Sequence, residues 1–234
     1  MLNMRCDPAL LFSVSVSIFG ILISLIFAFN PPVIQENFLW RKLMVGAAFG
    51  SICVLGIIAA LFPRKCSQTF HFQKQKNASH NFNSNFKGHH PQCPEFSAHV
   101  IHVNKHTLCA ACSGMILGAF ITLVGTVLYF FDWWQIEELS LLLILIGIAG
   151  LTLGFFQLKF KSFIRLFLNA VFVFGAFLIL IGFDALAHNL LFDFFLILLV
   201  IFWLFTRIKL SQWDHLKICS SCKISCVIRE VDKN

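Results

Sequence analysis

Three cysteines and a histidine in one polar segment have the types and spacing of metal ligands. Cys109 and Cys112 form a Cys-x-x-Cys pair, and Cys93 precedes them in the same segment. Zn²⁺ prefers thiolate and imidazole ligands, and a two-residue gap lets one turn of chain present two sulfurs to one ion. The pattern therefore predicts a tetrahedral zinc site. Its expected ligands are Cys93, Cys109, Cys112 and one histidine, His99 in preference to His90 or His89.

The Cys-x-x-Cys pair also permits redox chemistry. It directly precedes an apolar run, so we expect both cysteines at the start of a helix, where unpaired backbone N–H groups favour thiolates. A redox-active dithiol is therefore the main alternative to metal binding. Buried structural cysteines and a disulfide are weaker alternatives, because the segment is polar and its expected compartment is reducing.

A second group of cysteines lies near the C-terminus. Cys219, Cys222 and Cys226 follow His215 closely, and they form a second candidate metal site. His215, Cys66 or a histidine of the first segment would supply a fourth ligand, or the two groups would share one mixed site. An iron–sulfur cluster is a further alternative, although the spacing matches no ferredoxin pattern. Palmitoylated or solvated thiols are also open for this group.

The composition identifies the class of protein in which these cysteines lie. Of 234 residues, 58% are hydrophobic and 12% are charged, and the mean hydropathy is +0.82. The share of charge is about half that of a soluble domain. A soluble enzyme, a disordered regulator and a secreted disulfide scaffold are excluded as first interpretations, and no common hydrolase, metalloprotease or nucleotide-binding motif occurs. The sequence indicates an integral membrane protein.

Six stretches have the roughly 20 predominantly apolar residues that a helix needs to cross a bilayer. They lack the alternation that the strands of a membrane barrel require. The expected fold class is therefore all-α, with six transmembrane helices and a Cys/His-rich cytosolic loop between the second and the third. The predicted spans are residues 8–29, 43–62, 113–131, 139–157, 163–183 and 190–206.

Lysine and arginine indicate the orientation of these spans. Six spans put both termini on one side, and all of the 18 Lys and Arg except Arg41 and Lys42 fall on that side. The positive-inside rule then places both termini and the 63–112 loop in the cytoplasm, at the cell membrane. Because membrane topology accounts for the net charge of +7, no nucleic-acid partner is expected. The expected partners are the lipid bilayer and a protein at the cytosolic face.

The chain divides into four segments on this interpretation. Residues 1–62 contain two transmembrane helices, 63–112 the metal-binding loop, 113–206 four further helices, and 207–234 the cysteine-rich tail.

Small residues and isolated polar residues indicate how the spans pack. Pairs of glycines four residues apart predict close helix packing within one chain, whereas the first, fifth and sixth spans carry bulky residues and are expected to face lipid. Asn169 is expected to make an interhelical hydrogen bond, Cys53 to pack between helices, and residues 184–189 to form a turn near water. The glycine pairs are Gly46/Gly50, Gly114/Gly118 and Gly150/Gly154.

Two short stretches resemble the motif of a known but uncharacterised family. Residues 93–97 read Cys-Pro-Glu-Phe-Ser, and residues 109–114 read Cys-Ala-Ala-Cys-Ser-Gly. The family, of prokaryotic predicted multi-pass membrane proteins, has Pro-Glu-Arg-Ser-Phe followed by Cys-Ala-Arg-Cys-Thr-Gly at a helix start. Ala111 stands where the family usually has arginine, and Phe96 interrupts the Pro-Glu-Arg-Ser order. The resemblance covers about 30 residues, and implies a helical multi-pass fold and a functional role for Cys109 and Cys112, but no reaction.

These observations favour a multi-pass membrane protein whose cytosolic Cys/His site, occupied by zinc, orders a membrane-surface module for a partner or for lipid. One alternative is a membrane enzyme for thiol redox or iron–sulfur electron transfer. A second is a metal-ion transporter or sensor. The sequence indicates neither a catalytic residue nor an oligomeric state.

Overall fold

A computed structural model of the chain describes residues 8–32, 40–61, 86–87, 94–103, 106–131 and 136–221. Six helical spans in these residues are long and apolar enough to cross a membrane, as the sequence predicts. Single 3₁₀ turns, η1 (Pro94–His99), η2 (Glu137–Leu139) and η3 (Phe156–Lys159), accompany them. The helices are α1 (Pro8–Phe29), α2 (Arg41–Leu61), α4 (Ala110–Phe130), α5 (Ser140–Phe155), α6 (Ser162–Ala187) and α7 (Leu190–Ser221).

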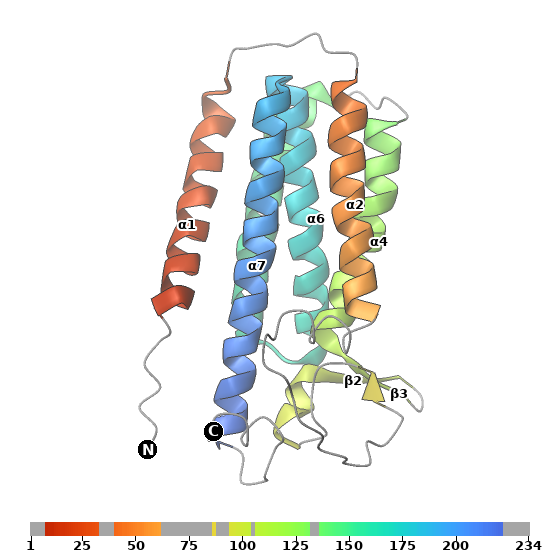
Figure 1. Ribbon diagram of the computed structural model, residues 1–234, viewed down its shortest axis with the longest axis vertical. Coiled ribbons are helices and arrows are strands. Elements are labelled where there is room, and N and C mark those ends of the chain that lie inside the picture. The colour runs from red at the N-terminus through yellow and green to blue at the C-terminus, as the bar shows by residue number, and fades with distance from the viewer. Residues whose placement is uncertain are drawn as a thin grey trace, which may run out of the picture.

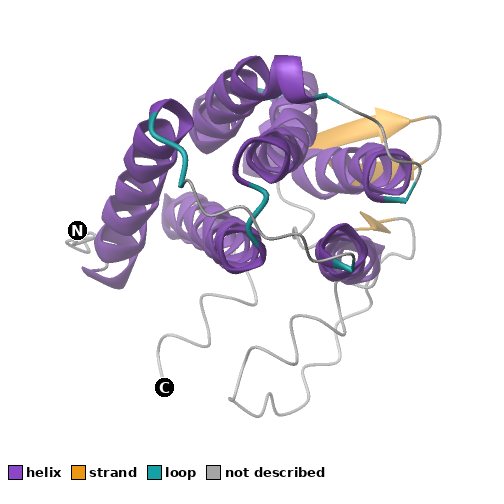
Figure 2. Ribbon diagram, turned by 90° about the horizontal axis from the view of Figure 1, so that it is seen from above, coloured by secondary structure: helices purple, strands orange, loops and turns teal. Residues whose placement is uncertain are grey.

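The helices run alternately up and down in one bundle. The start of α1, the start of α4 and the end of α7 lie at the same end of the bundle, next to a small sheet (Figure 1). We call this end the sheet end. Seen from above, the strands lie to one side of the bundle (Figure 2). Both cysteine-bearing segments therefore reach the same end of the molecule, because α4 starts there and α7 finishes there.

The small sheet is formed by the chain just before α4. Strands β2 (Val100–Val103) and β3 (His106–Cys109) pair antiparallel, with Val100 opposite Cys109, and β1 (Phe86–Lys87) pairs parallel to β3. Ile101 of β2 is buried, with 5% of its surface exposed. This hairpin was not expected from the sequence, which indicated a loop held by metal.

The centre of the bundle is α6, which packs mainly against α4 and α5. In this helix 78% of the membrane-length window is buried, against 22–44% in the other five. The expectation that the fifth span faces lipid is therefore wrong. Its neighbours present glycines, which let the bulky side chains of α6 approach closely: a Cβ on Gly147 of α5 would stand 2.6 Å from the backbone oxygen of Gly175 in α6. The glycine pairs act within one chain, as predicted.

The outer surface of the bundle has the distribution of a lipid-facing protein. In α1 the buried positions other than Leu10 are small or polar, whereas Phe12 and Phe19 are 67% and 63% exposed. Ser17 of α1 instead faces α7: its Oγ donates to Oγ1 of Thr206 at 2.9 Å, and its carbonyl accepts from Nε1 of Trp203 at 3.2 Å. Polar residues inside and apolar residues outside are the arrangement that a bilayer favours.

The turn between α6 and α7 is shorter than the sequence indicates. His188 ends α6 with φ 49° and ψ 38°, and Oδ1 of Asn189 accepts a hydrogen bond from the backbone N–H of Phe192 at 2.9 Å. This side-chain cap starts α7. Asp184 and Asp193 consequently lie inside the two helices and are fully buried, rather than in a turn near water.

Candidate functional site

The hairpin positions Cys109 and Cys112 at the start of α4. Cys109 ends β3 and is the N-cap residue of α4, which begins at Ala110, and Cys112 lies in the first turn. The prediction that this pair sits at a helix start is confirmed. The Cys109 side chain makes no capping hydrogen bond to the helix, but the two thiols hydrogen bond each other. Cys109 is buried and Cys112 half-buried, and both are free thiols.

Two arginines provide positive charge next to the cysteine pair. Arg207 of α7 interacts electrostatically with Cys109 and with Cys112, and Arg165 of α6 interacts with Cys109. Both arginines are only 3% exposed. A buried guanidinium needs hydrogen-bond acceptors and a counter-charge. The contacts of each arginine therefore determine what chemistry the pair supports.

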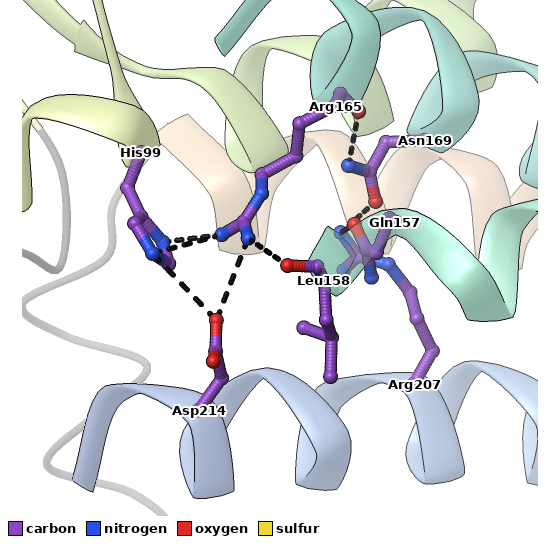
Figure 3. A network of polar contacts seen from close by, with 7 residues as sticks. All are labelled: His99, Gln157, Leu158, Arg165, Asn169, Arg207 and Asp214. Atoms are coloured by element: carbon purple, nitrogen blue, oxygen red, sulfur yellow. Dashed lines mark hydrogen bonds and ion pairs between the residues drawn. The ribbon is translucent and has the colours of Figure 1, made fainter. Parts of the chain in front are cut away.

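Arg207 is held by uncharged acceptors. Its Nη2 donates to Oδ1 of Asn169 and, at 3.3 Å, to Oε1 of Gln157 (Figure 3). Its Nη1 approaches the sulfur of Met115 at 2.6 Å. The prediction that Asn169 makes an interhelical hydrogen bond is confirmed. The buried Nε of Arg207 has no hydrogen-bond partner within the described part of the chain. Its charge is therefore fixed in place with no carboxylate among these contacts.

Arg165 connects the hairpin to α7. Its Nη1 contacts the imidazole nitrogens of His99, and its Nη2 donates to the carbonyl of Leu158 at 3.2 Å and to Oδ2 of Asp214 at 3.4 Å (Figure 3). Nε2 of His99 lies 3.6 Å from the same Asp214 oxygen, and the ring of His215 stacks edge-on at 5.5 Å from that of His99. The last turns of α7 are thereby docked against the hairpin.

The charges of this cluster do not balance while both thiols are neutral. Among the described residues, two guanidiniums, Arg165 and Arg207, face one carboxylate, Asp214, and each arginine keeps a buried Nε without a hydrogen-bond partner there. One negative charge at Cys109 or Cys112 would balance these charges. Arginine and a helix N-terminus favour a thiolate, whereas the burial of the two thiols opposes one, so a thiolate at this site depends on the charges of Arg165 and Arg207.

The structure brings together some of the predicted ligands. Cys109 and Cys112 lie together at the start of α4, and His99 lies against His215 of α7; Cys219 lies one turn further along α7. Within the part of the chain that the structure describes, however, no group of three His, Cys, Asp or Glu side chains has the geometry to hold a metal ion. The remaining predicted ligands lie outside the described residues: Cys93, His89, His90, Cys222 and Cys226.

The residues that sequence reasoning missed are Arg165, Arg207 and Asp214. The two arginines were counted only as charges on the cytoplasmic side of the membrane. For Arg165 a signal was present in the sequence, because it lies inside the predicted span 163–183 and an ionisable residue within a membrane-length helix indicates a functional site. Arg207 lies one residue beyond the predicted span 190–206, and only the structure shows that α7 continues to Ser221.

No family model, curated protein or solved structure matches this chain. The six helices in the described residues that are long and apolar enough to cross a membrane give the architecture of a multi-pass membrane protein.

Proposed function

We propose that the chain is a membrane thiol-redox protein whose working group is the Cys109–Cys112 dithiol. The observation that carries this proposal is the contact between the two thiols at the start of α4, with the charges of Arg207 and Arg165 beside them. One residue would become the thiolate, stabilised by these charges. The other lies close enough to close a disulfide.

The reaction is a two-electron exchange. One cysteine of the Cys109–Cys112 pair attacks, as its thiolate, a disulfide of a partner protein and forms a mixed disulfide with it. The second cysteine of the pair then attacks this mixed disulfide and displaces the partner's thiolate. The partner's disulfide is reduced to a dithiol, while Cys109 and Cys112 become joined by a disulfide. The two electrons pass to the partner's sulfurs, which also take up the two protons. The half-buried Cys112 is the sulfur that a partner reaches first, since Cys109 is buried.

The proposal includes the orientation of the protein in the membrane. Lys159 and Lys161, between α5 and α6, and Lys209 and Lys217, along the last turns of α7, all lie at the sheet end, and the positive-inside rule assigns such an end to the cytoplasm. Arg165 and Arg207 do not count in this comparison, because they are buried. A partner would then meet the dithiol at the cytosolic border of the membrane.

Metal binding is the second candidate function. His99, a predicted zinc ligand, directly precedes Val100, which pairs with Cys109. In the present arrangement both imidazole nitrogens of His99 face Arg165, so His99 would have to turn to bind a metal together with the two thiols. The iron–sulfur and metal-transport alternatives stay predictions.

One experiment distinguishes these functions. The detergent-purified protein is equilibrated in thiol/disulfide buffers of increasing potential, and its free thiols are counted by a maleimide mass tag, with elemental analysis of the same sample. Thiol redox predicts a two-electron transition that Cys109→Ser and Cys112→Ser each abolish, with no stoichiometric metal. Cys53→Ser is the control, because Cys53 is buried in α2 against Thr122. Stoichiometric zinc that is lost in Cys109→Ser would contradict the redox proposal and support the metal site.

A further inference from the structure

A second buried polar cluster lies at the end of the bundle opposite the sheet. Arg41, in the first turn of α2, is 4% exposed, and its Nη1 donates to Oδ1 of Asp184 in α6 at 2.5 Å and to Oδ2 of Asp193 in α7 at 2.6 Å. From α4, the hydroxyl of Tyr129 donates to Oδ2 of Asp184 at 2.7 Å. Four helices therefore contribute to one cluster.

The two carboxyl groups of this cluster are not equivalent. Asp184 has a donor on each oxygen, from Arg41 and from Tyr129. Among the described residues, Asp193 has a donor on Oδ2 only, and its Oδ1 is buried without a hydrogen-bond partner. Both side chains are 0% exposed. A buried carboxylate oxygen without a donor is strongly disfavoured, so Asp193 is the less stabilised of the two anions.

The charges of the cluster are also unbalanced. One guanidinium faces two carboxyl groups, Asp184 and Asp193, and both are fully buried. Two carboxylates that share one counter-charge repel each other, which favours a proton on one of them. A proton on Asp193 removes the excess negative charge.

The titratable groups around the cluster do not change the assignment of the proton to Asp193. Lys42 of α2 is half-buried and lies over the ring of Tyr129, with Nζ 4.9 Å from the ring centroid. His188 stands at the half-buried turn after α6, and Glu138 of η2 is exposed. Charges at these partly hydrated positions are screened more than the fully buried pair.

We propose that the Arg41–Asp184–Asp193 cluster is an intramembrane proton-binding site, with the exchangeable proton on Asp193. A metal cation is a poorer occupant, because hard cations take about six or more oxygen ligands and Asp193 Oδ1 is the oxygen of this carboxyl pair that lacks a donor. Release gives an ionised Asp193 and a proton in the water at that end of the bundle. Because α7 is attached to α2 through Asp193, the proton links helix packing to the pH of that compartment. This site is independent of the dithiol.

Infrared difference spectroscopy of the purified protein tests the proposal. At neutral pH the wild type should show the C=O stretch of a protonated carboxylic acid, which shifts in D₂O because the proton exchanges and disappears as the pH is raised. Asp193→Asn should abolish this band. Glu138→Gln, which removes an exposed carboxyl from the same end, should keep it. A wild type without the band, or a band that persists in Asp193→Asn, overturns the proposal.

Stability provides a second measurement. Asparagine is a neutral isostere of protonated aspartic acid, so Asp193→Asn should unfold in detergent at the same denaturant concentration as the wild type at neutral pH. Asp184→Asn should unfold earlier, because Arg41 and Tyr129 both lose their ionised acceptor. If Asp193→Asn is as destabilised as Asp184→Asn, or fails to fold, the assignment of the proton to Asp193 is wrong.

Discussion

Arg207 of α7 donates a hydrogen bond through Nη2 to Oδ1 of Asn169 in α6, deep in a bundle of apolar helices. A long arginine near a membrane border usually extends to the headgroups and leaves its charge in water. Here Asn169, Gln157 and Met115 hold the guanidinium inside the bundle instead. The charge is fixed next to Cys109 and Cys112, where it stabilises a negative charge on sulfur.

Replacing Arg207 should therefore slow the reaction of the dithiol. Arg207→Gln removes the charge beside Cys109 and Cys112, and the alkylation rate of Cys112 by iodoacetamide at neutral pH should fall by several-fold, since a nearby buried charge contributes about 1 kcal/mol or more. Arg207→Lys should retain part of the rate, because lysine keeps the charge without the planar fork.

The matched control for Arg207 is Lys209→Gln. It removes a positive charge two residues further along α7, where Nζ lies over the ring of Phe205 at 4.9 Å. An equal loss of rate in Lys209→Gln would show that general surface charge, rather than the fixed guanidinium, controls the thiols.

The docking of the hairpin on α7 should depend on Asp214. Asp214→Asn removes the anionic partner of Arg165 and His99, which weakens the contact by about 1–2 kcal/mol. Proteolysis between residues 94 and 109 should then accelerate by roughly five- to thirtyfold, because cleavage follows the population of the undocked segment. Gln212→Ala, at an exposed position of the same helix, should leave the cleavage rate unchanged.

Close packing of α5 on α6 should not tolerate a methyl group at Gly147. An added Cβ would stand 2.6 Å from the carbonyl oxygen of Gly175, a backbone atom that moves only with its helix. Gly147→Ala should lower the free energy of unfolding by about 1–3 kcal/mol, measured by SDS titration in mixed micelles. At Gly56 of α2 nothing lies within 4 Å of an added Cβ, so Gly56→Ala should be neutral or slightly stabilising.

The sequence predicts the helices of this protein well and their arrangement less well. Length and hydropathy define all six spans, because crossing a bilayer imposes one requirement on every helix. Because all six spans meet this requirement with similar hydropathy, hydropathy does not show which helix lies at the centre of the bundle. The fifth span is rich in Phe, Leu and Ile and was expected to face lipid, yet it is α6, the most buried helix. Bulky residues suit lipid and a core of small-residue neighbours equally well.

The candidate site, too, was predicted from the sequence only in part. The spacing of Cys109 and Cys112, followed by apolar residues, placed this cysteine pair at a helix start, with zinc binding as the first expectation and redox chemistry as the alternative, and Asn169 was expected to bond between helices. The partners of these residues come from α6 and α7, far away in sequence. Arg165, Arg207 and Asp214 have no spacing relation to the cysteines, so only the packing of the helices reveals the excess positive charge.

The attachment of α1 to α7 gives a last prediction. Ser17 Oγ donates to Thr206 Oγ1 at 2.9 Å, and both side chains are buried. A double-mutant cycle with Ser17→Ala and Thr206→Val should give a coupling energy of about 0.6 kcal/mol, the average of such pairs in membranes, measured by SDS-induced unfolding. Ser51→Ala is the control, because Ser51 is exposed and bonds its own helix at Ala47; it should couple to neither residue. Additive effects of the Ser17 and Thr206 changes would show that α1 is held by packing around Trp203 rather than by this hydrogen bond.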